Sequence, residues 1–188
     1  MANTDERLVR IFGHRESLSL DARFRLRLPD DLVGLLRVEL GRIAAQSNLP
    51  PAALQKLGFY LVPGTQRRIF LYPASNIESA IERFESPPPG VDPEELRAAR
   101  DYFYSTMAYL ETDKQGRLQI PDQLRQHAEI GEDDRHIVLM SHHHWLSIAK
   151  ASVAEELAAK GREALDRVGP SVLDPVQPRL PAFPQDGA

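Results

Sequence analysis

The chain has 188 residues, and its hydrophobic content of 42% is enough to bury the core of one ordinary domain or of two small ones. It contains no cysteine, which excludes disulfides, thiolate metal sites and cysteine nucleophiles. The formal net charge is −4, so any surface for nucleic acid must be local and cannot cover the molecule.

No apolar run approaches the roughly 20 residues that cross a bilayer. Residues 1–10 are polar and lack the apolar segment of a signal peptide. These features predict a cytoplasmic protein with no membrane partner.

The first predicted elements are a strand that ends near residue 28 and a helix that follows it. Leu26 and Leu28 alternate with arginines, which is the two-residue period of a strand with one buried face. Pro29 then suits the first turn of a helix, where its missing N–H would be unpaired anyway. Local positive charge is high here, at Arg15, Arg23, Arg25 and Arg27.

The middle of the chain predicts a strand at residues 68–72 and a helix opened by a capping box of Ser75 and Glu78. Residues 87–93 are rich in proline and too poor in backbone donors for an internal strand, so they indicate a boundary. Asp92 before Pro93 and two glutamates predicts the start of a helix that ends near residue 104.

Residues 113–124 then repeat residues 21–32, with six of the twelve positions identical between DARFRLRLPDDL and DKQGRLQIPDQL. The second copy continues through apolar strands at residues 136–140 and 145–148 to a helix with another capping box, Ser152 and Glu155. The copies are 92 residues apart at the motif but 76 apart at the later strands, where Tyr72 aligns with Ile148. An insertion of about 16 residues is therefore predicted in the first copy, at about residues 38–57.

These features predict two similar halves, residues 7–86 and 93–168, joined by a linker at 87–92. Residues 169–188 are rich in proline and poor in large apolar side chains, so they cannot offset the entropy lost on ordering. This tail is predicted to be disordered.

The two Asp-x-x-x-Arg motifs, Asp21 to Arg25 and Asp113 to Arg117, resemble those of the MraZ family of bacterial transcription factors, and the resemblance covers about residues 7–160. It implies an α+β, mainly β fold: a double swapped-hairpin, AbrB-like β-barrel with short flanking helices. It also implies a ring-like homo-oligomer, associated with the nucleoid, that binds direct repeats in double-stranded promoter DNA. Such a protein represses the division and cell-wall gene cluster, without a cofactor or a small-molecule substrate.

Carried over by position, the resemblance implies DNA contacts from Arg23, Arg25, Lys114 and Arg117, and loop-supporting roles for Asp21, Asp113 and Gly116. An arginine fork can bridge guanine O6 and N7 or clasp a phosphate, whereas a lysine acts as a mobile point charge. An aspartate cannot contact phosphate favourably. The two aspartates are therefore predicted to accept loop N–H groups and to hold the arginines in place.

The first motif departs from the family at Phe24, where the second has Gly116. Glycine at this position indicates a loop that requires a positive φ. Phenylalanine in that conformation costs roughly 1–2 kcal/mol. The first loop therefore either has a different shape or is repurposed, with Phe24 packing on a neighbour.

Other patterns favour ordinary structure over chemistry. Three consecutive histidines, His142 to His144, cannot all point at one ion from a strand, so a solvated turn is predicted in place of a metal site. The aromatic residues near the linker helix could stack on single-stranded nucleic acid, but a position in the core is favoured; they are Tyr102, Phe103, Tyr104 and Tyr109. No catalytic spacing is present, so no enzyme is predicted.

Two other functions remain open. In the first, the chain is a divergent relative that no longer binds DNA, and Phe24, the insertion and the acidic surface form a face for a protein partner. In the second, it is an antitoxin of the same hairpin fold, although such chains usually carry one copy of the motif.

Overall fold

A computed structural model describes residues 8–47 and 57–172. The chain divides into two compact units, residues 1–154 and 155–188. The first unit contains all the strands and the helices before residue 151. The second contains most of the last helix, α5 (Ala151–Val172). Helix α5 thus includes residues 169–172 of the segment predicted to be disordered, and residues 173–188 lie outside the described part.

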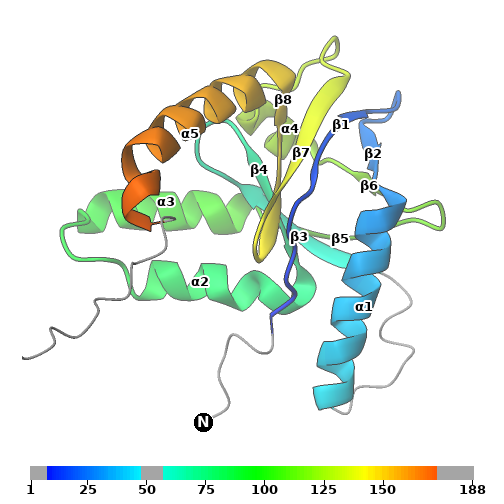
Figure 1. The fold of residues 1–188 in the computed structure, drawn as a ribbon, viewed down its shortest axis with the longest axis horizontal. Helices are drawn as coiled ribbons and strands as arrows, with labels where there is room; N and C mark the ends of the chain where they lie inside the picture. The colour runs from blue at the N-terminus through cyan, green and yellow to red at the C-terminus, as the bar shows by residue number, and fades with distance from the viewer. Residues whose placement is uncertain (1–7, 48–56, 173–188) are drawn as a thin grey trace, which may run out of the picture. The chain divides into compact units, whose positions relative to one another are not determined.

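Among the described residues, eight strands form the centre of the first unit (Figure 1). They are β1 (Arg15–Ser19), β2 (Arg25–Arg27), β3 (Gly58–Pro63), β4 (Ile69–Pro73), β5 (Ala108–Glu111), β6 (Arg117–Gln119), β7 (His136–His142) and β8 (Trp145–Lys150). Six of them form one sheet in the order β1-β7-β8-β4-β3-β5, and β2 and β6 form a separate ribbon. All neighbouring strands are antiparallel.

The sheet has an internal two-fold relation between β1–β4 and β5–β8. Exchanging these sets reverses the strand order onto itself, because β1-β7 becomes β5-β3 and β8-β4 becomes β4-β8. At one edge Ser19 pairs with His136, and at the other edge Glu111, which aligns with Ser19 in the repeat, pairs with Gly58. The hairpins β7–β8 and β4–β3 therefore lie next to each other at the centre of the sheet, and each outer strand pairs with the hairpin of the other half.

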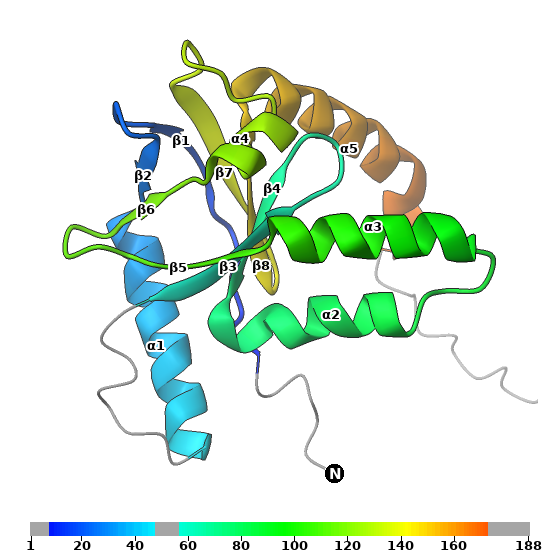
Figure 2. The ribbon, with the colours of Figure 1, turned by 180° about the vertical axis from the view of Figure 1, so that it is seen from behind.

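The fold is α+β with mainly antiparallel strands, as predicted. The six-stranded sheet is open: among the described residues, its edge strands β1 and β5 do not pair with each other. Each edge strand leads through a loop into the β2–β6 ribbon, which lies at the right of Figure 1 and at the left of Figure 2.

The alternation of apolar and polar residues in the repeated sequence corresponds to one buried and one outward face of the β2–β6 ribbon. Leu26, Leu28, Leu118 and Ile120 are each 0–1% exposed and belong to the main core. Burial of these side chains on one face confirms the predicted two-residue period. It also fixes the register, because a slip of one residue would turn the apolar set to solvent.

The helices that follow the two ribbon strands differ in length. Helix α1 (Asp30–Ser47) has 18 residues and α4 (Asp122–His127) has 6, and each begins directly after its proline. The predicted insertion at residues 38–57 therefore begins as a continuation of α1. Its remaining part includes residues 48–56, which lie outside the described chain.

Helices α2 (Ile77–Glu85) and α3 (Pro93–Thr106) lie side by side on either side of the linker (Figures 1 and 2). Asp92 caps α3 by accepting from the backbone N–H groups of Glu94 and Glu95, as predicted. No helix in the described ranges has both the length and the apolar character needed to cross a membrane.

The capping box predicted at Ser75 is wrong. A short 3-10 turn, η3 (Ala74–Asn76), precedes α2, and the N-cap Asn76 makes no side-chain capping bond. The buried Asn76 side chain instead pairs with both backbone groups of Val9, at 3.0 and 2.9 Å, and donates to the carbonyl of His144. The second box fails because α5 begins at Ala151, which places Ser152 inside the helix.

The prediction for the aromatic residues is correct for Phe103 and wrong for the three tyrosines. Phe103 is 6% exposed and packs on Phe84 of α2. The tyrosines are 41–50% exposed; they are Tyr102, Tyr104 and Tyr109. Their hydroxyl groups let them remain at the surface without the cost of burying a polar atom.

Candidate nucleic-acid interface

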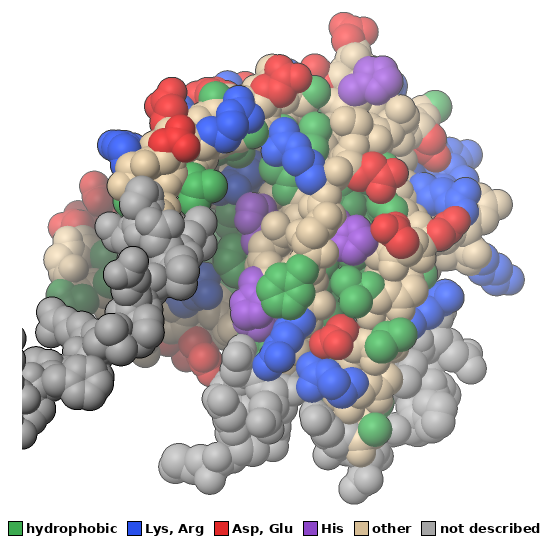
Figure 3. All heavy atoms as spheres, viewed as in Figure 1, with side chains coloured by type: hydrophobic (Ala, Val, Ile, Leu, Met, Phe, Trp, Pro, Cys, Tyr) green, Lys and Arg blue, Asp and Glu red, His purple; other side chains and the backbone are tan. Residues whose placement is uncertain are grey.

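The β2–β6 ribbon turns three arginines to the outside. Leu26 pairs with Leu118, and the flanking pairs are Arg25 with Gln119 and Arg27 with Arg117. Side chains alternate across a strand, so burial of the leucines places the flanking residues on the other surface. We call this surface, formed by Arg25, Arg27, Arg117 and Gln119, the ribbon face. Lys and Arg side chains with acidic neighbours lie along this side of the molecule at the right of Figure 3.

The first motif loop, residues 21–25, leads into β2 and is organised by Asp21. Its Oδ1 accepts from the backbone N–H groups of Arg23 and Arg25, at 2.9 and 3.0 Å. Its Oδ2 accepts from Arg25 Nε at 2.7 Å and lies 2.7 Å from Arg25 Nη2. The loop is closed by two backbone bonds, from Phe24 N to Asp21 O and from Asp21 N to Arg25 O.

The second motif loop, residues 113–117, repeats each of these bonds. Asp113 Oδ1 accepts from the backbone N–H groups of Gln115 and Arg117 at 2.8 and 2.9 Å, and Oδ2 accepts from Arg117 Nε at 2.8 Å. The backbone bonds run from Gly116 N to Asp113 O and from Asp113 N to Arg117 O. The two loops therefore have the same hydrogen-bond pattern, although only the aspartate and the arginine are shared in sequence.

These bonds favour the charged form of both aspartates. The arginine side chain is the largest cause, followed by the backbone N–H of the same arginine, and together they lower the pKa of Asp21 and of Asp113 from 3.8 to about 2. Each carboxylate remains charged at all physiological pH values and holds one edge of its guanidinium.

The motif arginines are oriented but retain donors for a ligand. A guanidinium has five N–H groups, and the aspartate engages Nε and one terminal nitrogen. The side chains of Arg25 and Arg117 are 25% and 27% exposed. Arg25 also lies 3.9 Å from Asp113 of the other loop, so the two motifs meet in one charged cluster.

The predicted site residues thus separate into two groups. Arg25, Arg117 and the two motif aspartates come together at the ribbon. Arg23 and Lys114 are exposed within the loops themselves. Arg27 lies on the ribbon face and pairs with Asp30 at 3.1 Å.

Phe24 has the left-handed conformation that the sequence indicated for glycine. Its φ is 55°, against 73° for Gly116. The carbonyls of both residues accept equivalent bonds, from Ile120 N to Phe24 and from Leu28 N to Gly116, each at 3.0 Å. The first loop does not differ in shape, which excludes one of the two predicted explanations.

The other explanation, packing on a neighbour, is correct. Phe24 is 7% exposed, and the guanidinium carbons of Arg125 and Arg135 lie 3.5 and 4.2 Å from the centre of its ring. Cation–π attraction and burial of the ring favour this arrangement. They offset the backbone strain of the left-handed conformation.

Arg125 and Arg135 are the residues that the sequence did not identify. Arg135 donates to the carbonyl of Asp21 at 3.0 Å and pairs with Glu132, and Arg125 pairs with Asp122 at 2.7 Å. Both belong to the second half of the chain, about a hundred residues from Phe24. A local pattern carries no signal for such contacts.

The three histidines do not form a uniformly solvated turn. His142 stacks on Trp145 and shares a 2.7 Å hydrogen bond with Ser147, and burial lowers its pKa. His143 is exposed, whereas His144 is half-buried. In the described parts of the chain, no three histidine, aspartate or glutamate side chains gather in an arrangement that could hold a metal ion.

Comparison with known proteins finds that part of this chain is similar to a transcriptional regulator. The relative is described as the transcriptional regulator MraZ of Lachnoclostridium phytofermentans, and this chain is 35% identical to it over 75 residues. The match covers 40% of this chain and 51% of that protein, so the chain spans about half of the length of the relative it matches. No family model matches the chain.

Proposed function

We propose that this chain is a sequence-specific, DNA-binding transcriptional regulator of the MraZ type, and that the ribbon face and the two motif loops contact the duplex. The observation that carries the proposal is the duplicated Asp–Arg loop, with one geometry on both strands of a single ribbon. A surface that evolved only for solubility has no need to hold two guanidinium groups in matching positions.

The shape and chemistry of the ribbon suit the major groove. That groove admits a two-stranded β-ribbon, and arginine reads guanine through O6 and N7. Arg25 and Arg117 are held by Asp21 and Asp113, so less conformational entropy is lost when they bind. Arg23 and Lys114 at the loops supply contacts to phosphate.

The finer features of the proposal follow the family resemblance. In this proposal the two halves, residues 7–86 and 93–168 with the linker at 87–92, form a swapped-hairpin, AbrB-like barrel that the ribbon completes. Several chains form a ring in which successive subunits contact successive direct repeats, and affinity arises from multivalency. In this proposal the protein acts in the nucleoid as a repressor of the division and cell-wall gene cluster.

The proposal is tested by a gel-shift titration with the DNA upstream of the gene. Arg117→Ala is expected to weaken binding by about 10- to 30-fold, the loss of one arginine contact with a base or phosphate. Arg97→Ala on α3, an exposed arginine 3.9 Å from Glu94, is the control and should bind as the wild type does. Native mass measured on the same samples should show one unchanged assembly.

Salt gives an independent readout. Affinity should fall steeply between 50 and 200 mM salt, because phosphate contacts release counterions. If Arg117→Ala binds the upstream DNA as well as the wild type, the assignment of the interface is wrong.

The alternative of a protein-binding face that includes Phe24 is disfavoured because that side chain is buried beneath two arginines.

A further inference from the structure

A second site lies away from the ribbon, between α2, α3 and the β3–β4 hairpin. It is a pocket of about 390 Å³, within the size range of small-molecule sites. Its apolar wall is formed by four segments: the β3–β4 hairpin, α2, the proline-rich linker and α3. The apolar side chains of this wall include Phe70, Phe84, Val91, Leu96 and Phe103. A linker that needed only to join two halves would not have to line a pocket.

The charge on the pocket wall is unbalanced. Arg83 lines the pocket, and no aspartate or glutamate does. Arg83 lies over the ring of Trp145, at 5.6 Å, and within the described residues it forms no ion pair. An apolar pocket that carries one unneutralised guanidinium is complementary to a ligand with an apolar body and a single anionic group.

Tyr72 also lines the pocket and carries a hydroxyl group that can donate a hydrogen bond. The residue is 4% exposed, and burial raises the pKa of its hydroxyl while the positive charge of Arg83 partly opposes that shift. Its ring stacks on Trp145 with centroids 5.8 Å apart. Arg83 and Tyr72 thus both line the pocket, and both lie against Trp145.

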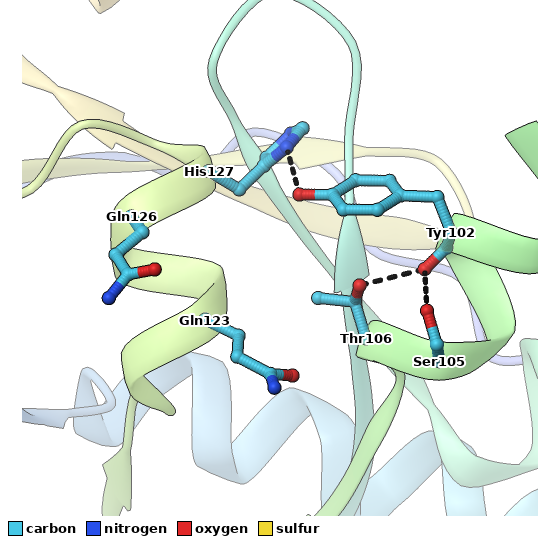
Figure 4. A pocket seen from close by; sticks show the side chains of 6 residues that line it. All are labelled: Tyr102, Ser105, Thr106, Gln123, Gln126 and His127. Atoms are coloured by element: carbon cyan, nitrogen blue, oxygen red, sulfur yellow. Dashed lines mark hydrogen bonds between the residues drawn. The ribbon is translucent and has the colours of Figure 1, made fainter.

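A second, polar pocket adjoins this one and differs in chemistry (Figure 4). His127 of α4 and Tyr102 of α3 line both pockets, and the Tyr102 hydroxyl lies 3.1 Å from His127 Nδ1. His127 Nε2 lies 2.7 Å from the Gly64 carbonyl, which can only accept, so Nε2 carries the proton. The remaining side chains of the polar pocket are uncharged, including Gln123 and Gln126. It offers no cation to an anionic group.

We propose that the apolar pocket binds a small amphipathic carboxylate, whose charged end meets Arg83 and Tyr72 and whose hydrocarbon lies among Phe70, Phe84 and Leu96. A carboxylate suits one guanidinium and one hydroxyl, whereas a phosphate dianion would need further cations. The proposal does not depend on DNA binding, since its residues are separate from the ribbon face.

The test uses decanoate as the probe and the full-length protein. Trp145 is the single tryptophan of the chain and lies against both Arg83 and Tyr72, so its fluorescence reports on the pocket. Decanoate should change this fluorescence saturably, with the same dissociation constant by calorimetry. Decan-1-ol has the same chain without the charge and should bind about tenfold more weakly, the worth of one partly solvated charge-assisted hydrogen bond.

Variants locate the site. Arg83→Gln should weaken decanoate about tenfold and leave decan-1-ol unchanged, while Ala99→Phe should fill the pocket and remove binding of both. Arg83 and Ala99 are exposed helix positions, so both variants should fold. Arg97→Gln on α3 and Gln123→Ala in the polar pocket are the matched controls and should behave as the wild type does. Absence of saturable binding, equal affinity for decanoate and decan-1-ol, or full affinity in Arg83→Gln would overturn the proposal.

Discussion

The two motif loops reach one geometry by different chemical routes. In the second loop, Gly116 adopts φ of 73° without strain, and a Cβ built there meets nothing within 4 Å. In the first loop, Phe24 adopts φ of 55°, and its ring is buried beneath Arg125 and Arg135. The conformation is therefore fixed by the aspartate hydrogen bonds, and the fourth residue decides only how it is stabilised.

The difference also changes what surrounds each loop. Arg125 and Arg135 lie over the Phe24 ring, so the first loop is braced by the second half of the chain. Open space lies beside Gly116, next to Lys114 and Arg37. The first loop should thus be held by tertiary packing, and the second by its own hydrogen bonds.

The largest expected effect is on DNA affinity. It tests whether the two motif loops, which have the same geometry, contribute equally to DNA binding. Arg25→Ala should weaken binding as much as Arg117→Ala, because each arginine is held by the same carboxylate contacts. The double variant should lose about 4 kcal/mol, a factor of about a thousand, from two contacts of about 2 kcal/mol each. Arg97→Ala combined with Arg162→Ala removes two exposed charges elsewhere and is the control for net charge. A wild-type affinity for Arg25→Ala alone would show that the first loop has lost its DNA contact.

The second effect concerns stability at Phe24. Phe24→Ala should lower the free energy of unfolding by about 3 kcal/mol, because it removes a buried ring and leaves a strained alanine. Phe24→Gly removes the same ring but relieves the left-handed strain, so it should be about 1 kcal/mol more stable than Phe24→Ala. Urea unfolding at neutral pH measures both. The usual order, with alanine more stable than glycine, would mean that the first loop relaxes out of its left-handed conformation.

How far the sequence could anticipate this site depends on the range of the interactions. The alternation at Leu26 and Leu118, the two prolines and the Asp92 cap act within a few residues, and the structure has them as predicted. The repeat also identified Asp113 and Arg117 as partners, because their bonds span four residues. Local chemistry of this kind is visible in a single sequence.

The features that were missed depend on contacts across the chain. Strand β3 forms at residues 58–63, where no strand was predicted, and it pairs with β4 and with β5 of the other half. The capping box predicted at Ser75 does not form: the N-cap is Asn76, whose side-chain amide makes hydrogen bonds with Val9, 67 residues away. The length of α1 could not be predicted either. Aligning the two copies locates the inserted residues but does not show whether they extend a helix or form a loop.

A smaller effect on stability is expected at Gly116. Gly116→Ala should cost about 1–2 kcal/mol, entirely from backbone strain, since the added Cβ has open space. Gly34→Ala is the matched control because it also has open space, but it lies within helix α1 and should be stabilised by about 0.5–1 kcal/mol. Thermal or urea unfolding of the two variants should therefore shift in opposite directions. A shift of both in the same direction would contradict the account of the loop.

The smallest effect is the acid dependence that both loops share. The pKa of Asp21 and of Asp113 is lowered from 3.8 to about 2 in the folded protein, so between these values the unfolded chain binds more protons. Their contribution to stability is therefore complete above pH 3.8 and is lost as the pH falls toward 2. Asp21→Asn with Asp113→Asn should flatten the acid limb of the unfolding free energy measured from pH 5 to pH 2. Glu94→Gln with Glu95→Gln, which removes two exposed carboxylates of α3, should leave that limb unchanged. If one single Asp→Asn variant accounts for the whole change, the two loops are not electrostatically equivalent, and the shared geometry does not imply a shared charge state.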